Sequence, residues 1–452
     1  MEYIVNTPSG AVRGVAIKSG TAVAYRGIRY ARAARFEYPS EVMSWEGVYD
    51  ATEYGNCAYQ PRTFYNEEEM PKKVFYYNEF RKGASYTYSE DCLFLNIWTP
   101  EVIPAGKQLP VLVYIHGGGF NGGCGHEKHF DGPVWPTRGI IAVTINYRLG
   151  PLGFLCLPEL REEAGYTGNY GLHDQLTALQ WVHDNIAAFG GDPGNVTIMG
   201  QSAGAMSVQQ HALSPLSDGL FHRAVMSSGG GVHKMLSAPQ PDRHFPFWKA
   251  VMEQAGCADL AAFRALPADK LFAVWQKARK EVKGGGMATS PVLDGRLIVG
   301  TGTELLSAGK QKQIPYMIGS TSEDMMPPIL YKMVKDWCAA QKTPAYAWFF
   351  DRRLPGDKNG AWHSSDLWYW FGTLENGWRP MEEKDRALSD AMVAYLCSFV
   401  RTGDPNDGSQ TKWEAYNSGA QAMRLGEGDL RMGSPSGLKL LITMLTNKAV
   451  GE

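Results

Sequence analysis

A serine lies at the centre of the most informative motif in this sequence. Residues 196–204 read VTIMGQSAG and place Ser202 in a G-x-S-x-G pattern, between a predicted strand and a predicted helix. On such a sharp strand-to-helix turn, glycines permit close backbone approach, and the serine hydroxyl stays exposed near a helix N-terminus. The motif therefore indicates a nucleophilic serine, and the alternative is a glycine-rich turn that only packs.

A serine hydroxyl is a weak nucleophile, so it needs a base to take its proton and a third group to orient that base. In folds that carry this motif the order along the chain is serine, acid, histidine. His363 is the only histidine after His244, so this order predicts His363 as the general base. Without the order constraint, a histidine in the segment GAWHSSD would be interpreted as a solvent-facing loop residue.

Two adjacent carboxylates are candidates for the acid. A predicted strand at residues 314–318 is followed by GSTSED, which ends in Glu323 and Asp324. Adjacent side chains point in different directions, and the pattern does not say which of them faces His363. The other carboxylate is expected to be solvated or to lie behind the first.

A triglycine segment supplies the expected oxyanion site. A predicted strand at residues 110–115 runs directly into His116 and the sequence GGGF. In this setting, backbone N–H groups converge on the developing alkoxide, and one donor is worth about 3 to 4 kcal/mol of transition-state stabilisation. We expect the donors to be Gly118, Gly119 and Ala203. The triglycine at residues 284–286 lacks this context and is expected to be a turn.

The elements that must position these residues follow an alternating pattern. Short apolar runs at residues 93–98, 111–115, 140–145 and 196–199 predict buried strands. Apolar residues spaced by three and four within 171–188 predict a helix, and residues 203–213 are expected to form another. Strand-like residues 3–5 and 11–17 around a turn predict an N-terminal hairpin. The fold class is therefore α/β, with a mostly parallel central sheet covered by helices on both faces.

Composition excludes several classes of protein. The 452 residues are 44% hydrophobic with a net charge of -2, and they show no basic cluster that would bind nucleic acid. No apolar run is long enough to cross a membrane, and no signal peptide is recognisable at the N-terminus, so a cytoplasmic location is expected. Seven dispersed cysteines are expected to be thiols. No H-E-x-x-H or C-x-x-C motif is present, and we expect neither a metal nor a cofactor.

Several blocks in order resemble the type-B carboxylesterases, a family that includes cholinesterases and bacterial nitrobenzyl esterases. The blocks are GIRYA (27–31), EDCLFLNI (90–97), HGGGF (116–120), NYRLG (146–150), residues 189–204 and TGDPN (402–406). The resemblance covers nearly the whole chain and implies one α/β-hydrolase domain over residues 1–452. It also implies the triad Ser202, Asp324 and His363, with Ser228 as a buried serine beside it.

The sequence departs from that family at several positions. The family usually has Glu where this chain has the shorter Asp324, so Glu323 stays open as the alternative acid. Gln201 stands where Glu is common, which removes a negative charge beside the nucleophile and disfavours cationic substrates such as choline esters. Cys57 and Cys92 match a disulfide of secreted relatives, but both are expected to be thiols here.

The region between acid and base is short. Only 39 positions separate Asp324 from His363, where full-length relatives carry a sizeable helical subdomain. The resemblance therefore implies a shortened cap at residues 324–363 and a more open gorge, with residues 57–92 as one wall. Aromatic residues near this region are candidates for stacking on a substrate, although core packing explains each of them more readily. They are Phe64, Tyr65, Phe75, Tyr76, Tyr77, Phe80, Tyr86, Tyr88, Trp348, Phe349, Trp362, Trp368, Tyr369, Trp370 and Phe371.

These features predict a serine carboxylesterase whose partner is a small-molecule ester, either a soluble short-chain ester or an aromatic one. A lipase or a phenolic (feruloyl) esterase is the alternative, and a non-catalytic adhesion protein of the same fold is a more distant one. Because His363 must be neutral to act as a base, kcat/KM is expected to rise with pH through about 6 to 7. The physiological ester and the oligomeric state stay open.

Overall fold

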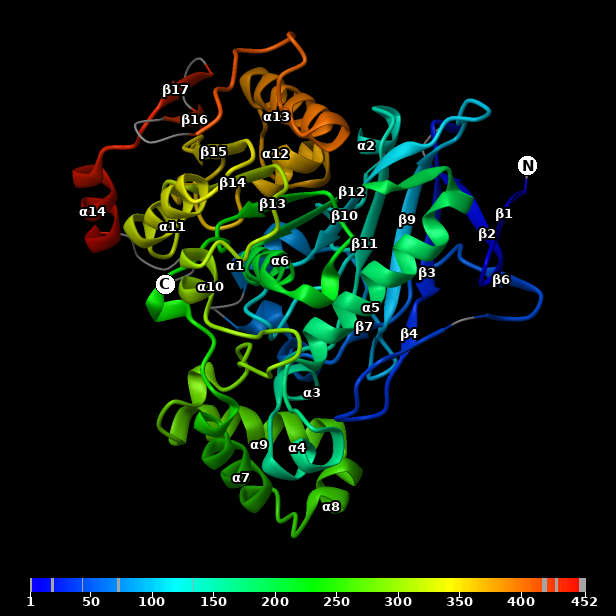
Figure 1. The fold of residues 1–452 in the computed structure, drawn as a ribbon, viewed down its shortest axis with the longest axis vertical. Coiled ribbons are helices and arrows are strands. Elements are labelled where there is room, and N and C mark those ends of the chain that lie inside the picture. The colour runs from blue at the N-terminus through cyan, green and yellow to red at the C-terminus, as the bar shows by residue number, and fades with distance from the viewer. Residues whose placement is uncertain are drawn as a thin grey trace.

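A computed structural model of the chain describes residues 2–17, 20–42, 44–70, 74–132, 134–416, 421–426 and 430–446. These residues build a central sheet of 13 strands (Figure 1). Its parallel part consists, in spatial order, of β11 (Ile141–Ile145), β10 (Leu109–Ile115), β12 (Gly191–Gln201), β13 (Arg223–Ser227), β14 (Tyr316–Thr321), β15 (Ala345–Phe350) and β16 (Ala422–Leu425).

Antiparallel strands extend the sheet at both edges. On the N-terminal side these are β1 (Tyr3–Thr7), β2 (Gly10–Ile17), β3 (Ala22–Arg29) and β9 (Phe94–Pro100), and on the other side β17 (Arg431–Gly433). Shorter strands are β4 (Ala31–Arg32), β5 (Ser40–Glu41), β6 (Val48–Asp50), β7 (Cys57–Ala58) and β8 (Tyr88–Ser89). The β1–β2 pair is the predicted hairpin, with Val5 opposite Val12.

Both faces of the sheet are buried. Successive side chains of a strand point to opposite faces, so each strand contributes to two apolar cores. Val111, Val113 and Ile115 enter one apolar core, whereas Leu112 and Tyr114 enter the other. The first core includes side chains of α5 (Tyr170–Asn185), α6 (Ala203–Leu213) and α11 (Pro327–Ala339), and α10 (Gly302–Ser307) lies against α6. The second core includes side chains of α1 (Val74–Phe80), α2 (Val134–Thr137), α12 (Leu367–Phe371) and α13 (Glu383–Thr402).

A third apolar core, not predicted from the sequence, belongs to a helical lobe at the bottom of Figure 1. The lobe contains α4 (Pro158–Ala164), α7 (Phe245–Gln254), α8 (Leu260–Ala265) and α9 (Ala268–Glu281), with α3 (Gly150–Phe154) between it and the sheet. Trp248 and Trp275 are fully buried in this core. The remaining helix, α14 (Gly437–Thr446), packs on α11.

Comparison with the predicted elements confirms the fold class. α6 has the predicted bounds, and α5 ends at Asn185, where the chain tightens into a 3-10 helix over Ile186–Phe189. Between Asp324 and His363 the structure holds one helix, α11, and one strand, β15. Among the described residues, no helix is long and apolar enough to cross a membrane.

Candidate active site

Neighbouring parallel strands bring the predicted site residues to one edge of the sheet. Ser202 follows β12, Ser228 follows β13 and Asp324 lies just beyond β14. In the β12–β13–β14 ladder, Gly200 pairs with Met226, and Met226 pairs with Ile318, so these strands end together. Side chains beyond the carboxyl ends of such strands share one crevice.

Ser202 occupies a strained backbone position at the β12–α6 junction. Its φ of 57° lies in the left-handed region, with ψ at -125°, a combination that non-glycine residues adopt only where the surrounding structure enforces it. The Ser202 N–H donates to Ser227 O at 2.8 Å, which ties the turn to β13. The side chain is neither buried nor fully exposed, as a nucleophile requires.

The two motif glycines allow this turn to pack closely. A Cβ at Gly200 would lie 2.3 Å from backbone atoms of Gly204, and a Cβ at Gly204 would lie 2.0 Å from Ile115 O. Real Cβ atoms do not approach backbone atoms so closely, so both positions require glycine. The G-x-S-x-G pattern is thus explained by the contact of α6 with β12 and β10.

His363 is held by Asp324. Its Nδ1 lies 2.6 Å from Asp324 Oδ1, and the Asp324 carboxylate is buried. The other carboxylate oxygen accepts from Thr321 N at 3.3 Å and from Thr321 Oγ1 at 3.1 Å, while Met325 N donates to Oδ1 at 2.8 Å. These bonds fix the carboxylate, so Nδ1–H of a neutral imidazole donates to it and Nε2 keeps its lone pair.

The charges of this pair reinforce one another. Burial raises the pKa of Asp324, but the charge and hydrogen bond of His363, together with the nearby Ser228 hydroxyl, outweigh it, so this pKa is lowered. Burial likewise lowers the pKa of His363, but the charge and hydrogen bond of Asp324 and the charge of Asp366 outweigh it, so this pKa is raised. Ser228 therefore lies beside the Asp324 carboxylate.

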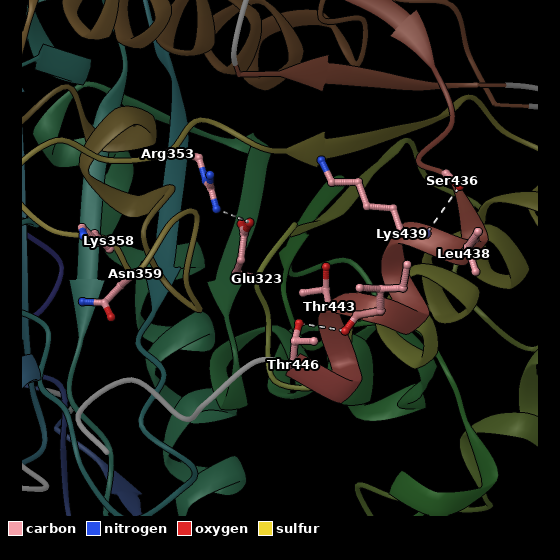
Figure 2. A pocket seen from close by; sticks show the side chains of 10 residues that line it. Glu323, Arg353, Lys358, Asn359, Ser436, Leu438, Lys439, Thr443 and Thr446 are labelled. Atoms are coloured by element: carbon pink, nitrogen blue, oxygen red, sulfur yellow. Dashed lines mark hydrogen bonds and ion pairs between the residues drawn. The ribbon is translucent and has the colours of Figure 1, made fainter.

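Glu323 points elsewhere. Its N–H donates to Ala361 O at 3.1 Å, its Oε2 accepts from Ala361 N at 3.0 Å, and its Oε1 lies 3.9 Å from a guanidinium nitrogen of Arg353. Figure 2 shows the side chain directed toward Arg353. It lines a cavity of about 590 Å³ that is also bordered by Ser436 and by residues of α14, among them Leu438 and Lys439. Asp324 contacts the imidazole of His363, whereas Glu323 contacts Ala361 and Arg353.

Gln201 contacts the nitrogen of His363 that faces away from Asp324. The Gln201 side chain is buried, and its Nε2 lies 3.2 Å from His363 Nε2. An amide N–H in this place donates to the lone pair of the neutral imidazole. Because Gln201 immediately precedes Ser202, the contact brings the imidazole to the nucleophile turn.

The triglycine loop lies against the same turn. A Cβ at Gly117 would be 3.0 Å from Ser202 Cβ, and Gly118 and Gly119 are exposed with φ values of 110° and 62°. A Cβ at Gly118 would lie 2.1 Å from Gly122 O. Within the described part of the chain, no group accepts from the N–H of Gly118 or Gly119, which leaves both for a ligand. By contrast, the second triglycine contributes to a short 3-10 turn, Gly285–Met287.

A second buried carboxylate lies close to the triad, and the sequence analysis did not single it out. Asp366 Oδ2 accepts from Ser227 Oγ at 2.7 Å and from Trp370 Nε1 at 3.1 Å. Burial raises the pKa of Asp366 to about 6, against a lowering effect of the Ser227 hydrogen bond. The sequence signal, an Asp three residues after the histidine, is too common to identify it.

Several of the aromatic residues named from the sequence pack around the loop that carries His363. Two of these residues lie in α1: the rings of Phe75 and Tyr76 are edge-on to Trp362, and their centroids lie 5.1 and 5.7 Å from that of Trp362. Tyr76 OH also donates to His363 O at 3.4 Å. Trp348, Trp368 and the other tryptophans of this group are fully buried, in agreement with core packing.

All seven cysteines are free thiols. Cys57 and Cys92 match a disulfide of secreted relatives, but Cys57 contacts His126 here. Its Sγ lies 3.4 Å from His126 Nε2. Cys92 is buried.

Comparisons with known proteins identify the family and several relatives of this chain. The family model described as "Carboxylesterase family" matches residues 1–336 and 329–433. The para-nitrobenzyl esterase of Bacillus subtilis (strain 168) is 29% identical over 92% of this chain and 92% of that protein. The fumonisin B1 esterase of Sphingopyxis macrogoltabida is 34% identical over 72% of this chain and 56% of its own length. A solved PNB esterase structure aligns with a TM-score of 0.84 and 26% identity, covering 98% of this chain and 99% of that one.

Proposed function

Because this chain belongs to the carboxylesterase family and is a carboxylic ester hydrolase, we propose that Ser202, His363 and Asp324 are its catalytic triad. The observation that carries this proposal is the 2.6 Å contact between His363 and Asp324 beside the strained turn of Ser202. In this arrangement His363 Nε2 is the base, and Asp324 keeps the proton of the neutral ring on Nδ1.

The reaction we propose has two acyl-transfer steps. Ser202 Oγ attacks the ester carbonyl while His363 Nε2 takes its proton, and the negative charge that develops on the carbonyl oxygen is stabilised by N–H groups of Gly118, Gly119 and Ala203. The imidazolium then gives its proton to the leaving alcohol, and the acyl group stays on Ser202. Water repeats the same steps on the acyl-enzyme, which releases the acid and restores the serine.

Gln201 fits this cycle as a positioning residue. Its amide N–H can hold the neutral imidazole by donating to Nε2 before the substrate binds. When Nε2 becomes protonated, that N–H no longer has a lone pair to donate to, and the new N–H of His363 is directed to the serine or alcohol oxygen. The neutral amide adds no negative charge, which agrees with uncharged rather than cationic esters as substrates.

We propose soluble short-chain or aromatic esters as the substrate class. Two observations support it: the short stretch between Asp324 and His363, with only α11 and β15 in it, and the aromatic residues Phe75 and Tyr76 beside the His363 loop. Residues 57–92, described except for 71–73, then form one wall of an open entrance. A relative with substantial identity is a para-nitrobenzyl esterase, whose name indicates an aromatic ester. We also propose a cytoplasmic location, which the free thiols support.

The first test compares the wild type with Ser202→Ala on p-nitrophenyl acetate, butyrate, octanoate and palmitate, and on methyl ferulate. We expect the wild type to prefer the short esters, and we expect the variant to lose activity by about 10³-fold or more, because the nucleophile is missing. Ser290→Ala, which removes a hydroxyl that donates to Met287 O at 2.7 Å, is the matched control and should have the activity of the wild type. Equal rates for wild type and Ser202→Ala would contradict the proposal, and a preference for palmitate would favour a lipase.

A further inference from the structure

Two thiols and an imidazole form a compact cluster away from the triad. Cys57 lies in β7, and Cys124 and His126 lie in the loop that follows the triglycine segment. The two sulfur atoms and a ring nitrogen of His126 all lie within 4.8 Å of one another. Both cysteine side chains are buried, with exposed fractions of 0% and 1%. The three residues therefore present one ligand atom each to a common point.

The spacing of these atoms matches a tetrahedral metal site. Zinc binds thiolate sulfur at about 2.3 Å and imidazole nitrogen at about 2.0 to 2.1 Å, so a tetrahedral arrangement separates the two ligand atoms by about 3.5 Å. Cys57 Sγ and His126 Nε2 lie 3.4 Å apart. An ion would thus fit between them with small movements of the side chains.

We propose that Cys57, Cys124 and His126 bind one zinc ion. Two thiolates and one imidazole are the donor set that a borderline-soft divalent ion prefers, whereas Mg²⁺ and Ca²⁺ prefer oxygen ligands. On binding, each cysteine loses its thiol proton to solvent, and the two thiolates neutralise the charge of the ion. Three protein ligands leave a fourth position for water.

The groups around the cluster fit this role. The His126 ring stacks on Tyr54 with centroids 4.5 Å apart and planes 9° apart, which fixes its orientation. Within the described residues, the enclosed Tyr86 hydroxyl has no hydrogen-bond partner, and its ring centroid lies 5.6 Å from that of His126. This hydroxyl is available to donate to a zinc-bound thiolate or to a water in the fourth position.

The nearby charges are already balanced, so they do not repel the ion. Arg62 is paired with Glu127 at 2.7 Å, and Arg81 lies 3.4 Å from the same carboxylate and 2.7 Å from Glu67. A site of two thiolates and one Zn²⁺ adds no net charge to this network. The cluster can therefore change from two thiols to a zinc site without leaving a buried charge unpaired.

The ion would join two segments that border the active site. Gln60, in the segment that begins at Cys57, accepts from Gly123 N at 2.9 Å and donates to Gly123 O at 3.1 Å. Gly122, one residue earlier, donates to Gly118 O at 3.1 Å in the oxyanion loop. Zinc bound to both Cys57 and Cys124 would add metal–sulfur bonds between the same two segments. Because the ion would hold these two segments together, metal binding should raise the unfolding temperature.

The test uses the full chain, purified with reductant, stripped with a chelator and then returned to buffer without either. Co²⁺ is added first, because a thiolate–cobalt site gives a charge-transfer absorption band in the near ultraviolet, and Zn²⁺ is then titrated in competition. We expect one metal ion per chain, loss of the cobalt band on zinc addition, and no such effect from Mg²⁺ or Ca²⁺. Zinc should also raise the melting temperature of the wild type.

Substitutions of the proposed ligands test where the ion binds. Cys124→Ser and His126→Ala should weaken zinc binding by at least tenfold and lose most of the cobalt band, while Cys257→Ser, in a half-buried position whose Sγ contacts Ala255 O, should bind as the wild type does. Circular dichroism checks that each variant folds, and the two independent ligand variants keep the test valid if one does not. Equal zinc binding by wild type and both variants would overturn the proposal. So would the absence of a thiolate–cobalt band in the reduced wild type, or a Cys57–Cys124 disulfide that persists under reducing conditions.

Discussion

At the scale of single residues, two buried carboxylates act on His363 in different ways. Asp324 bonds to its Nδ1 at 2.6 Å, while Asp366 bonds to Ser227 and Trp370 and contributes to His363 through its charge. Both raise the pKa of His363, although burial alone would lower it. The base is therefore neutral, and active, only above a pH somewhat higher than the ordinary histidine value of about 6.5.

Replacing Asp366 with asparagine should separate the effect of its charge from that of the hydrogen bonds. The amide keeps an oxygen for Ser227 and Trp370 but removes the negative charge, so the pKa of His363 should fall. The rising limb of kcat/KM against pH should then move to lower pH, and activity at pH 6 should improve relative to that at pH 8. The shift is measured with p-nitrophenyl butyrate from pH 5 to 9. An unmoved limb with normal folding would show that Asp366 does not act on the base.

The two adjacent carboxylates give a sharper test of the triad acid. Asp324→Asn leaves an amide opposite Nδ1 and favours the wrong tautomer of His363, so kcat should fall by about 10⁴-fold. Glu323→Gln, one residue earlier, changes a contact with the exposed Arg353 side chain and should stay within about threefold of the wild type. Steady-state kinetics of both variants checks this. A large loss in Glu323→Gln with little loss in Asp324→Asn would assign the acid to Glu323.

At the scale of elements, the nucleophile turn depends on how closely α6 approaches the strands beside it. Gly204 lies in the first turn of α6, and a Cβ there would stand 2.0 Å from Ile115 O of β10. We expect Gly204→Ala to force α6 away from the sheet and to lower the free energy of unfolding by about 3 kcal/mol, together with a large loss of kcat.

Gly437→Ala provides the matched control for this prediction, because Gly437 also starts a helix but has open space around its Cβ position. Alanine is the better helix former there, so its stability should be unchanged or slightly higher. Denaturant unfolding measures both variants. If Gly204→Ala were as stable as Gly437→Ala, close packing of α6 would not explain the motif.

The features that could be predicted from the sequence are those set by local elements, and the features that could not are those set by contacts distant in sequence. Elements with a local signature were predicted closely, such as α6 after the serine and the β1–β2 hairpin, because hydrophobic period and turn residues are local properties. The residue pattern alone left both Asp324 and Glu323 open as the acid, because the directions of their side chains depend on the isolated β-bridge that Glu323 forms with Trp362, which is distant in sequence. Cys57 meets His126 across 69 positions of sequence, a contact that no spacing rule encodes.

At the scale of the whole molecule, several histidines are buried as neutral groups within the apolar cores and near the site. His116, His129 and His211 are at most 2% exposed. Burial lowers the pKa of His116 to about 4, and those of His129 and His211 to about 3. In the unfolded chain each of them titrates near the ordinary value of about 6.5.

These depressed pKa values make the stability of the fold sensitive to acid. Above pH 6.5 the histidines are neutral in both states, and their contribution to stability is complete. As the pH falls from 6.5 toward 4, the unfolded chain takes up protons that the folded chain excludes, and each histidine costs about 1.4 kcal/mol per pH unit. The free energy of unfolding should therefore fall steeply over this range, which is measured by urea unfolding at pH 7, 6 and 5.

A variant at one of these positions isolates the effect. His211 Nε2 lies 3.1 Å from Gln175 Oε1 within α6 and α5, and His211→Gln keeps a donor for that oxygen without a group that titrates. Its absolute stability should drop, because the smaller side chain fills the site less well, but its slope of stability against pH below 6.5 should be shallower than that of the wild type by about 1.4 kcal/mol per pH unit. Parallel slopes for the two proteins would mean that His211 takes up its proton in the folded state as readily as in the unfolded one, and acid sensitivity would then have to come from the other buried histidines.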